Sequence, residues 1–251
     1  MPITKCVLLT GSHGKLGKAI RLSLAFDDLL SPTHSQLDIN NEKQISDFFS
    51  THNIDIVIHC AAYARLEACE KNPAMALQTN LIGTAHLVSE VLRQQQARQK
   101  LIRFIYISTD GVYECNRGNY SEKDATLPYS IYGWTKLGGE MAVRLLVRHC
   151  IIRTSFFDPE SIPFESAPKD VYSSKLTIND LVDAISFLSD HPFNGVVNVG
   201  SPKNSDYERY KYFKTNLKPC TRKDIAKHVT FNFPYDSSLN CNLWKTILQL
   251  K

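Results

Sequence analysis

The sequence predicts an α/β fold, namely a Rossmann-type doubly wound parallel sheet with a small C-terminal substrate-binding region. Three observations predict it. Short apolar runs such as residues 6–10 are typical of strands buried on both faces of a parallel sheet. Amphipathic helical segments alternate with these runs, and a glycine-rich turn at residues 11–17 joins the first strand to the first helix.

The strand and helix signals can be placed in order along the chain. The expected strands cover residues 6–10, 29–31, 55–62, 101–107, 150–155 and 195–200. The expected helices run from the glycine turn to Leu24, over residues 42–52, from Asn72-Pro73 through Leu92, onward from about Tyr132, and over residues 178–188, 206–215 and 240–250.

The regular alternation loosens after residue 155, because residues 156–174 carry three prolines and no clear period. We therefore expect residues 1–155, completed by 177–200, to form an NAD(P)-binding Rossmann core. Residues 156–176 and 201–251 should form the small substrate-binding region.

Composition narrows the class of protein. The chain has 251 residues, of which 43% are hydrophobic and 22% charged, as in ordinary globular proteins. Its net charge of +4 is scattered, which argues against a nucleic-acid partner, and its apolar runs are too short for a membrane span. The seven cysteines lack metal-ligand spacing, so no metal is expected. The chain start has no signal-peptide pattern, so a cytoplasmic location is expected.

The glycine turn is a candidate phosphate site. Gly11, Gly14 and Gly17 follow the first strand in the spacing G-x-x-G-x-x-G, with His13, Lys15 and Leu16 between them. Glycines let the backbone approach a pyrophosphate, and the following helix offers unpaired N–H groups. A merely tight turn is the alternative, but the position at the first strand–helix junction favours dinucleotide binding.

The segment after the second strand bears on cofactor choice. Residues 31–35 contain no carboxylate to accept from ribose hydroxyls, so NADP(H) is preferred and NAD(H) stays open. Thr33 and His34 are candidate contacts of a 2′-phosphate, although His34 also fits an ordinary loop histidine. Asp38 is the competing ribose or adenine contact.

The third strand ends in the small residues Ala61 and Ala62, which would let a cofactor pass close by. Asn80 lies on the otherwise apolar face of the long helix that follows. It should either satisfy a neighbouring backbone group or hold the active-site architecture.

Tyr132 and Lys136 form the central catalytic candidate. At i and i+4 of a helix they lie on one face, where an ammonium can lower the pKa of a phenol and make it a usable acid or base. Thr109 follows the fourth strand, where its hydroxyl could bind a substrate carbonyl or simply cap the next turn. The Tyr-x-x-x-Lys spacing also occurs by chance in exposed helices, so these signals must be read together.

In combination, these motifs resemble the dTDP-4-dehydrorhamnose reductase family of the extended short-chain dehydrogenase/reductase superfamily. The matching stretches are residues 11–17, Leu37-Asp38-Ile39, Ala61-Ala62-Tyr63, Asn80-x-x-Gly83-Thr84, residues 107–113, Tyr132-Gly133-x-x-Lys136, Arg153-Thr154-Ser155 and residues 233–239.

The resemblance implies a Thr109, Tyr132 and Lys136 triad. Tyr132 would protonate the C4 oxygen of a keto sugar while NAD(P)H delivers hydride, Lys136 would hold the nicotinamide ribose, and Thr109 would orient the keto oxygen. Ile39 and Tyr63 join the cofactor site by the same likeness. The family's tyrosine after Ser-Thr-Asp is Gly111 here, and its tryptophan after Arg-Thr-Ser is Phe156.

The expected function is therefore NAD(P)H-dependent reduction of a nucleotide-linked 4-keto-6-deoxy sugar, with the nucleotide sugar as partner and a homodimer as an open assembly. The alternative is a non-catalytic NADP-binding regulatory subunit like the methionine adenosyltransferase beta subunit. Epimerisation of the same sugar would need a further acid–base pair, which the motifs do not supply.

Overall fold

The computed structural model describes residues 5–23, 25–229 and 231–249. The expected helix limits at Leu24 and Leu250 lie outside these residues. No helix in the described part of the chain is long and apolar enough to cross a membrane.

The central sheet has six strands, and all of its neighbouring pairs are parallel. From edge to edge they are β10 (Gly195–Asn198), β5 (His149–Thr154), β4 (Arg103–Thr109), β3 (Ile56–His59), β1 (Cys6–Thr10) and β2 (Asp28–Leu30). The chain leaves β1 to one side for β2 and returns to the other side as β3. This is the topological switch point at which doubly wound sheets bind ligands, and it confirms the predicted fold class.

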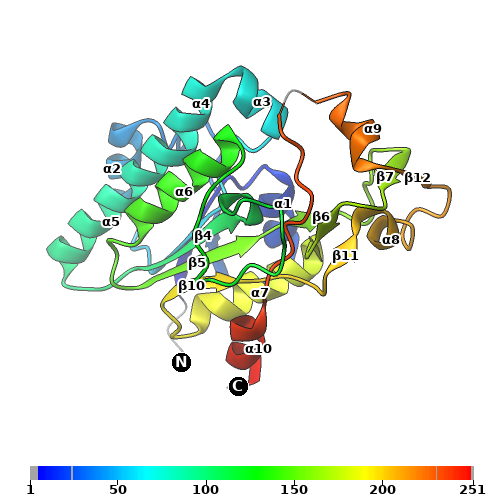
Figure 1. The fold of residues 1–251 in the computed structure, drawn as a ribbon. Coiled ribbons are helices and arrows are strands. Elements are labelled where there is room, and N and C mark those ends of the chain that lie inside the picture. The colour runs from blue at the N-terminus through cyan, green and yellow to red at the C-terminus, as the bar shows by residue number, and fades with distance from the viewer. Residues whose placement is uncertain (1–4, 24, 230, 250–251) are drawn as a thin grey trace.

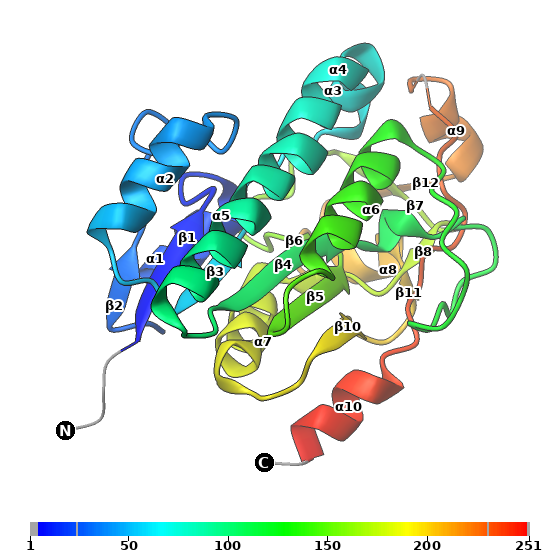
Figure 2. The same cartoon turned by 90° about the vertical axis from the view of Figure 1, so that its left-hand side faces the viewer.

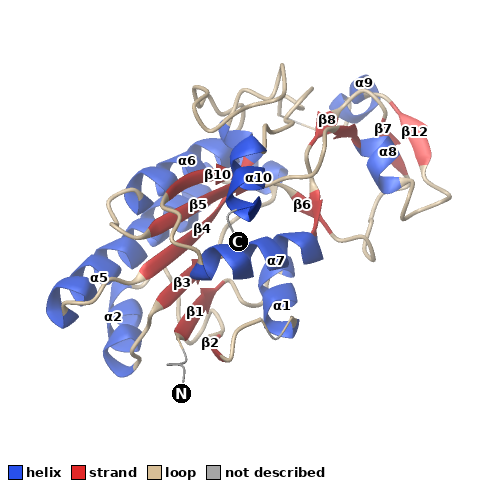
Figure 3. Ribbon diagram, turned by 90° about the horizontal axis from the view of Figure 1, so that it is seen from below, coloured by secondary structure: helices blue, strands red, loops and turns tan. Residues whose placement is uncertain are grey.

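Helices cover both faces of the sheet (Figures 1 and 3). One core packs strand residues against α1 (Lys15–Leu22), α7 (Ile178–Asp190) and α10 (Asn242–Gln249). The other packs them against α2 (Glu42–Thr51), α5 (Gly83–Arg98) and α6 (Ile131–Val143). Val7 and Leu9 face the first core and Leu8 the second, as the two-residue period of a doubly buried strand requires.

The long expected helix after Asn72 is composite. The Asn72 side chain accepts a hydrogen bond from the Met75 backbone at the start of α4 (Pro73–Leu77), which follows α3 (Leu66–Lys71). A π-helical turn, η1 (Gln78–Ile82), then separates α4 from α5. The π turn contains Asn80, consistent with the frequent occurrence of such turns at functional sites.

The small elements gather at one side of the core (Figures 1 and 2). They are the strand pairs β6 (Phe156–Phe157) with β9 (Leu176–Thr177), β7 (Ser166–Pro168) with β12 (Lys218–Cys220), and β8 (Tyr172–Ser173) with β11 (Asn204–Ser205), and the helices α8 (Asp206–Tyr210) and α9 (Arg222–Ala226). The helix expected over residues 206–215 thus ends at Tyr210, because Phe213 turns back and packs edge-on against Phe157.

Residues 233–241, which we call the closing segment, return from the small region to the core. Its backbone bridges Tyr120 at Leu239 and Tyr172 at Asp236. The closing segment therefore lies between the loop after β4 and the segment that carries β8.

Candidate active site

A cavity of about 470 Å³ lies beyond the carboxyl ends of β1 and β3, at the switch point. The predicted cofactor residues that line it are Gly11, His13, Gly14, His34, Asp38, Ile39, Ala61, Ala62 and Tyr63. The lining residues that the sequence analysis missed are Thr10, Ser12, Pro32, Leu37, Asn40, Cys60, Asn72, Met75 and Thr79.

Gly11 lets the glycine turn pack directly against the backbone that follows β3, at the base of the cavity. Its φ is +69°, and a Cβ at this position would lie 2.5 Å from the Ala61 backbone nitrogen. Only glycine combines this conformation with so close an approach. Gly17 closes the turn in a similar way, since a Cβ there would lie 2.2 Å from the Gly11 carbonyl oxygen.

Ser12 ties the glycine turn to the segment after β2. Its buried hydroxyl donates to the Pro32 carbonyl at 2.8 Å and contacts Nδ1 of His13 at 2.9 Å. Because Ser12 occupies an unspecified position of the glycine motif, spacing alone gave no signal for it.

Three further polar residues shape the wall that follows β2. The exposed His34 ring lies 3.6 Å from a carboxylate oxygen of Asp38, and the same oxygen accepts from the Asn40 backbone at 2.9 Å. The side-chain oxygen of Asn40 is sealed and has no hydrogen-bond partner among the described residues; it would lie 3.1 Å from a Cβ on Gly83. The polar groups of this wall are therefore an imidazole and a carboxylate.

Several predicted cofactor residues lie outside this cavity. Lys15 instead lines a surface hollow beside α7, and Leu16 is buried in the core. Thr33 is partly buried, and its hydroxyl bonds the side chains of Ser35 and Gln36. Lys15, Leu16 and Gly17 form the first turn of α1, so their backbone N–H groups have no partners within the helix.

Asn80 links the cavity to α6. It accepts from the Tyr63 backbone at 2.7 Å, and donates to the Tyr63 carbonyl at 3.0 Å and to the Thr135 hydroxyl at 2.9 Å. Both expected roles are met by this geometry: Asn80 satisfies a backbone group and holds the wall of the cavity next to Lys136.

The end of β4 is packed tightly against the start of α6. Thr109 accepts from the Gly111 backbone at 3.0 Å and donates to Asp110 at 3.2 Å, so the expected local cap is present. A Cβ on Gly133 would lie 2.2 Å from the Gly111 carbonyl oxygen. This contact brings Tyr132 up to the Thr109 turn.

Tyr132 and Lys136 lie one turn apart on α6, as predicted. Ser130 caps this helix by accepting from the Gly133 backbone at 3.1 Å. The Lys136 ammonium lies 3.9 Å from the centre of the Tyr106 ring. Tyr132 is partly exposed, and its hydroxyl has no hydrogen-bond partner within the described residues.

The expected lowering of the Tyr132 pKa is wrong for this structure. Burial, the Asp110 carboxylate and Cys69 raise the pKa of Tyr132 above its ordinary value. Burial also lowers the pKa of Lys136 to about 7, against smaller opposing effects of Cys60 and Glu140. An ammonium that is half lost at neutral pH and directed at Tyr106 cannot offset the desolvation of the phenol. Tyr132 is thus held as a protonated acid.

Asp110 joins the site to the closing segment. Its buried carboxylate accepts from Ser155 at 2.9 Å and from Ser237 at 2.8 Å. Burial raises its pKa, and the hydrogen bonds and Lys175 oppose this effect. The ends of β4 and β5 and the closing segment therefore meet at one carboxylate.

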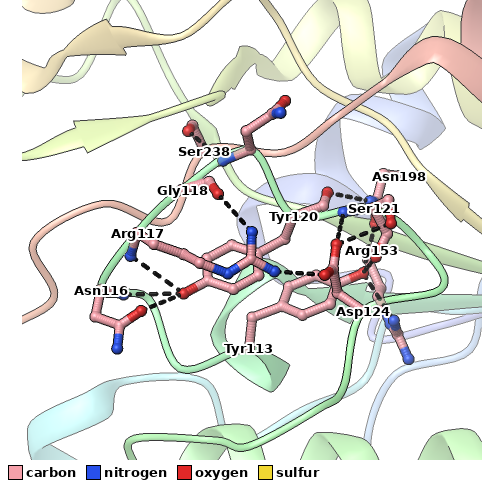
Figure 4. A network of polar contacts seen from close by, with 11 residues as sticks. Tyr113, Asn116, Arg117, Gly118, Tyr120, Ser121, Asp124, Arg153, Asn198 and Ser238 are labelled. Atoms are coloured by element: carbon pink, nitrogen blue, oxygen red, sulfur yellow. Dashed lines mark hydrogen bonds and ion pairs between the residues drawn. The ribbon is translucent and has the colours of Figure 1, made fainter.

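A second network fixes the loop after β4 (Figure 4). Arg153 donates to both carboxylate oxygens of Glu140, at 3.0 and 2.7 Å, and to the Tyr113 hydroxyl at 2.8 Å. The rings of Tyr113 and Tyr120 stack at 4.8 Å, and Asn198 donates to the Tyr120 carbonyl at 2.8 Å. The loop is thereby held over β5 and β10.

The seven cysteines are free thiols, and no group of three His, Cys, Asp or Glu side chains in the described ranges could hold a metal ion. The arrangement offers instead a dinucleotide-sized cavity, a phenol beside a lysine, and polar groups at the ends of parallel strands. Such a fold, with its cavity at the switch point, defines a Rossmann-type nucleotide-binding protein.

The family model described as RmlD substrate binding domain matches residues 5–160, and the chain belongs to this family. A dTDP-4-dehydrorhamnose reductase of Mycobacterium tuberculosis H37Rv is 33% identical over 144 residues, which are 55% of this chain and 45% of that protein. A methionine adenosyltransferase 2 subunit beta of Pongo abelii is 29% identical over 146 residues, or 55% and 42% of the two chains. In sequence, the chain thus spans about half the length of the curated relatives it matches.

The structural likeness extends further. The crystal structure of dTDP-4-dehydrorhamnose reductase from Bacillus anthracis in complex with NADP superimposes with a TM-score of 0.85 and 25% identity, covering 98% of this chain and 92% of that one.

Proposed function

We propose that this protein is an NAD(P)H-dependent reductase of a nucleotide-linked 4-keto-6-deoxy sugar, with NADP(H) preferred and NAD(H) as the second cofactor. The observation that carries the proposal is the packing of the Tyr132–Lys136 helix against the end of β4, beside the switch-point cavity. The names of the reductase relatives support the substrate class.

The residues of the cavity fit a dinucleotide. Gly11 and Gly14 leave room for a pyrophosphate at the first turn of α1, whose N–H groups lack helical partners. His34 would face a 2′-phosphate, and Asp38 and Asn40 the adenosine, whereas Thr33 lies outside the cavity. When bound, the reduced nicotinamide supplies a hydride.

Side chains of this protein donate the proton and hold the cofactor and substrate in position. Tyr132 donates its phenolic proton to the C4 oxygen as the carbonyl is reduced, and burial keeps that proton in place at neutral pH. Lys136 holds the nicotinamide ribose. The Thr109 hydroxyl rotates away from its hydrogen bonds with Gly111 and Asp110 and orients the keto oxygen.

Tyr132→Phe tests the proposed acid. The variant should bind NADPH normally and lose about 10²-fold or more of its turnover, because proton transfer by a positioned side chain contributes 10²–10⁴-fold. NADPH binding by fluorescence and reduction of dTDP-, UDP- and GDP-4-keto-6-deoxyhexoses, with and without a 3,5-epimerase, give the two readouts. Full activity in the variant would remove Tyr132 from the proposed role.

The regulatory subunit is the competing proposal, because the Pongo abelii relative carries that name. Oxidation of NADPH by one sugar in the panel supports the reductase. Tight NADP(H) binding without turnover, together with co-purification of a methionine adenosyltransferase, supports the regulatory subunit instead. A cytoplasmic location and a homodimer stay predictions of the sequence.

A further inference from the structure

Tyr129 is a second phenol beside the end of β4. A Cβ on Gly111 would lie 3.8 Å from Cε1 of the Tyr129 ring. Gly111 itself carries no side chain, so the space next to Thr109 and Asp110 is filled by a ring that arrives from the segment leading into α6.

The position of this ring is fixed on both sides. Tyr129 lies between the buried Pro128 and the helix cap Ser130. Its ring packs against the cluster that contains Val112, Tyr113, Cys115 and Tyr120. A ring held between a helix cap and a hydrophobic cluster presents its hydroxyl in a defined place.

The Tyr129 hydroxyl has no hydrogen-bond partner among the described residues, unlike the hydroxyls of Tyr113 and Tyr120. Tyr113 donates to the Ser121 carbonyl at 2.9 Å, and Tyr120 donates to Asn116 at 2.8 Å. In the part of the chain that the structure describes, the hydroxyl of Tyr129 has no partner. The hydroxyl oxygen is not one of the fully buried polar atoms that lack a partner. It is therefore accessible from outside the protein.

The Tyr129 ring lies beside the Thr109 turn against which α6 packs, since the same Cβ on Gly111 would lie 3.3 Å from the Thr109 hydroxyl oxygen. Burial raises the pKa of Tyr129, and the ionisable groups of Cys115, Asp110, Tyr132 and Glu70 raise it further. Tyr129 therefore stays protonated and can donate a hydrogen bond. No other group in the described residues uses that donor.

We propose that Tyr129 determines sugar specificity by donating a hydrogen bond to a hydroxyl of the hexose next to its keto carbon. This inference rests on the proposed function, and it makes Tyr129 a contact of the sugar rather than of the cofactor. A site built around such a donor rejects substrates that lack the matching oxygen.

The test compares Tyr129→Phe with the wild type on two substrates, the keto sugar nucleotide that the wild type reduces and its 3-deoxy analogue. On the complete sugar, kcat/KM should fall about 10-fold or more in the variant, chiefly through KM. On the 3-deoxy sugar the two proteins should be equal, because the hydrogen bond is absent from both. The KM and Kd for NADPH should not change.

Tyr212→Phe is the matched control, because Tyr212 is 82% exposed and lies outside the site. It should match the wild type on both sugars. Equal kcat/KM of Tyr129→Phe and wild type on the complete sugar would overturn the specificity role, and so would an equal loss on both sugars or weaker NADPH binding. A wild type that reduces no keto sugar would refute the proposed function itself, and the role of Tyr129 with it.

Discussion

Lys136 is a buried lysine of α6 whose ammonium lies over the Tyr106 ring of β4. The i, i+4 spacing correctly placed it one turn from Tyr132, since helix geometry alone decides that. The predicted lowering of the Tyr132 pKa by this lysine was wrong, because desolvation depends on the surrounding packing. The Tyr106 ring and the depth of burial come from β4, which no local motif reveals.

Burial of Lys136 predicts a pH-dependent effect of Lys136→Met on stability. The pKa falls from an ordinary 10.5 to about 7 in the fold, so between these values the unfolded chain binds a proton that the folded chain does not. The contribution of Lys136 to stability is thus lowest below pH 7 and rises toward pH 10.5. The free energy of unfolding of Lys136→Met should exceed that of the wild type by on the order of 1–3 kcal/mol at pH 6, and by less at pH 9.5.

Urea unfolding of both proteins at pH 6, 8 and 9.5 measures this difference. Comparing the variant with the wild type at each pH cancels the titration of every other group. A gain that is the same at all three values would show that the lysine keeps its ordinary pKa in the fold.

At the scale of elements, the sequence predicted the six core strands and the main helices, because long periodic segments carry a strong signal. It missed the pairs β7–β12 and β8–β11, whose strands of two or three residues are too short for any period. It also missed the π turn at Asn80, since the apolar pattern runs through it unbroken.

The cap of α6 links the stability of an element to the site. Ser130→Ala removes the acceptor of the Gly133 N–H and should cost about 1 kcal/mol. Because Tyr132 lies in the first turn of this helix, kcat should fall as well. Thr177→Ala is the matched control, since Thr177 caps α7 by accepting from the Asp180 backbone at 3.2 Å.

The control should lose similar stability in thermal unfolding but keep its kcat. If the two cap variants lose activity to the same extent, the effect comes from general destabilisation rather than from the start of α6. Ser130→Thr, which retains a hydroxyl, should restore most of the loss.

At the scale of the molecule, the Arg153–Glu140 pair connects β5, α6 and the loop after β4. Both side chains are almost fully buried, at 2% and 0% exposure. Glu140→Gln should destabilise the protein by about 3–5 kcal/mol, because it leaves a buried guanidinium without its counter-charge. Guanidinium unfolding measures the change.

The double variant Glu140→Gln with Arg153→Met should recover part of this loss, since the uncompensated charge is gone. Additive losses in the double variant would contradict the coupling. Arg153 lies in a stretch that resembles the family, but its pairing with Glu140 joins positions 13 residues apart on different elements, which the sequence pattern does not specify.

The closing segment also sets when the site can form during synthesis. The bond from Ser237 to Asp110 spans 127 residues, and that from the Asn119 backbone to Ser238 spans 119. A ribosome delivers the Thr109 and Tyr132 regions long before residue 237 emerges. Contacts of such sequence separation form late, so a nascent chain carries Thr109 and Tyr132 before Asp110 has its partner in the closing segment.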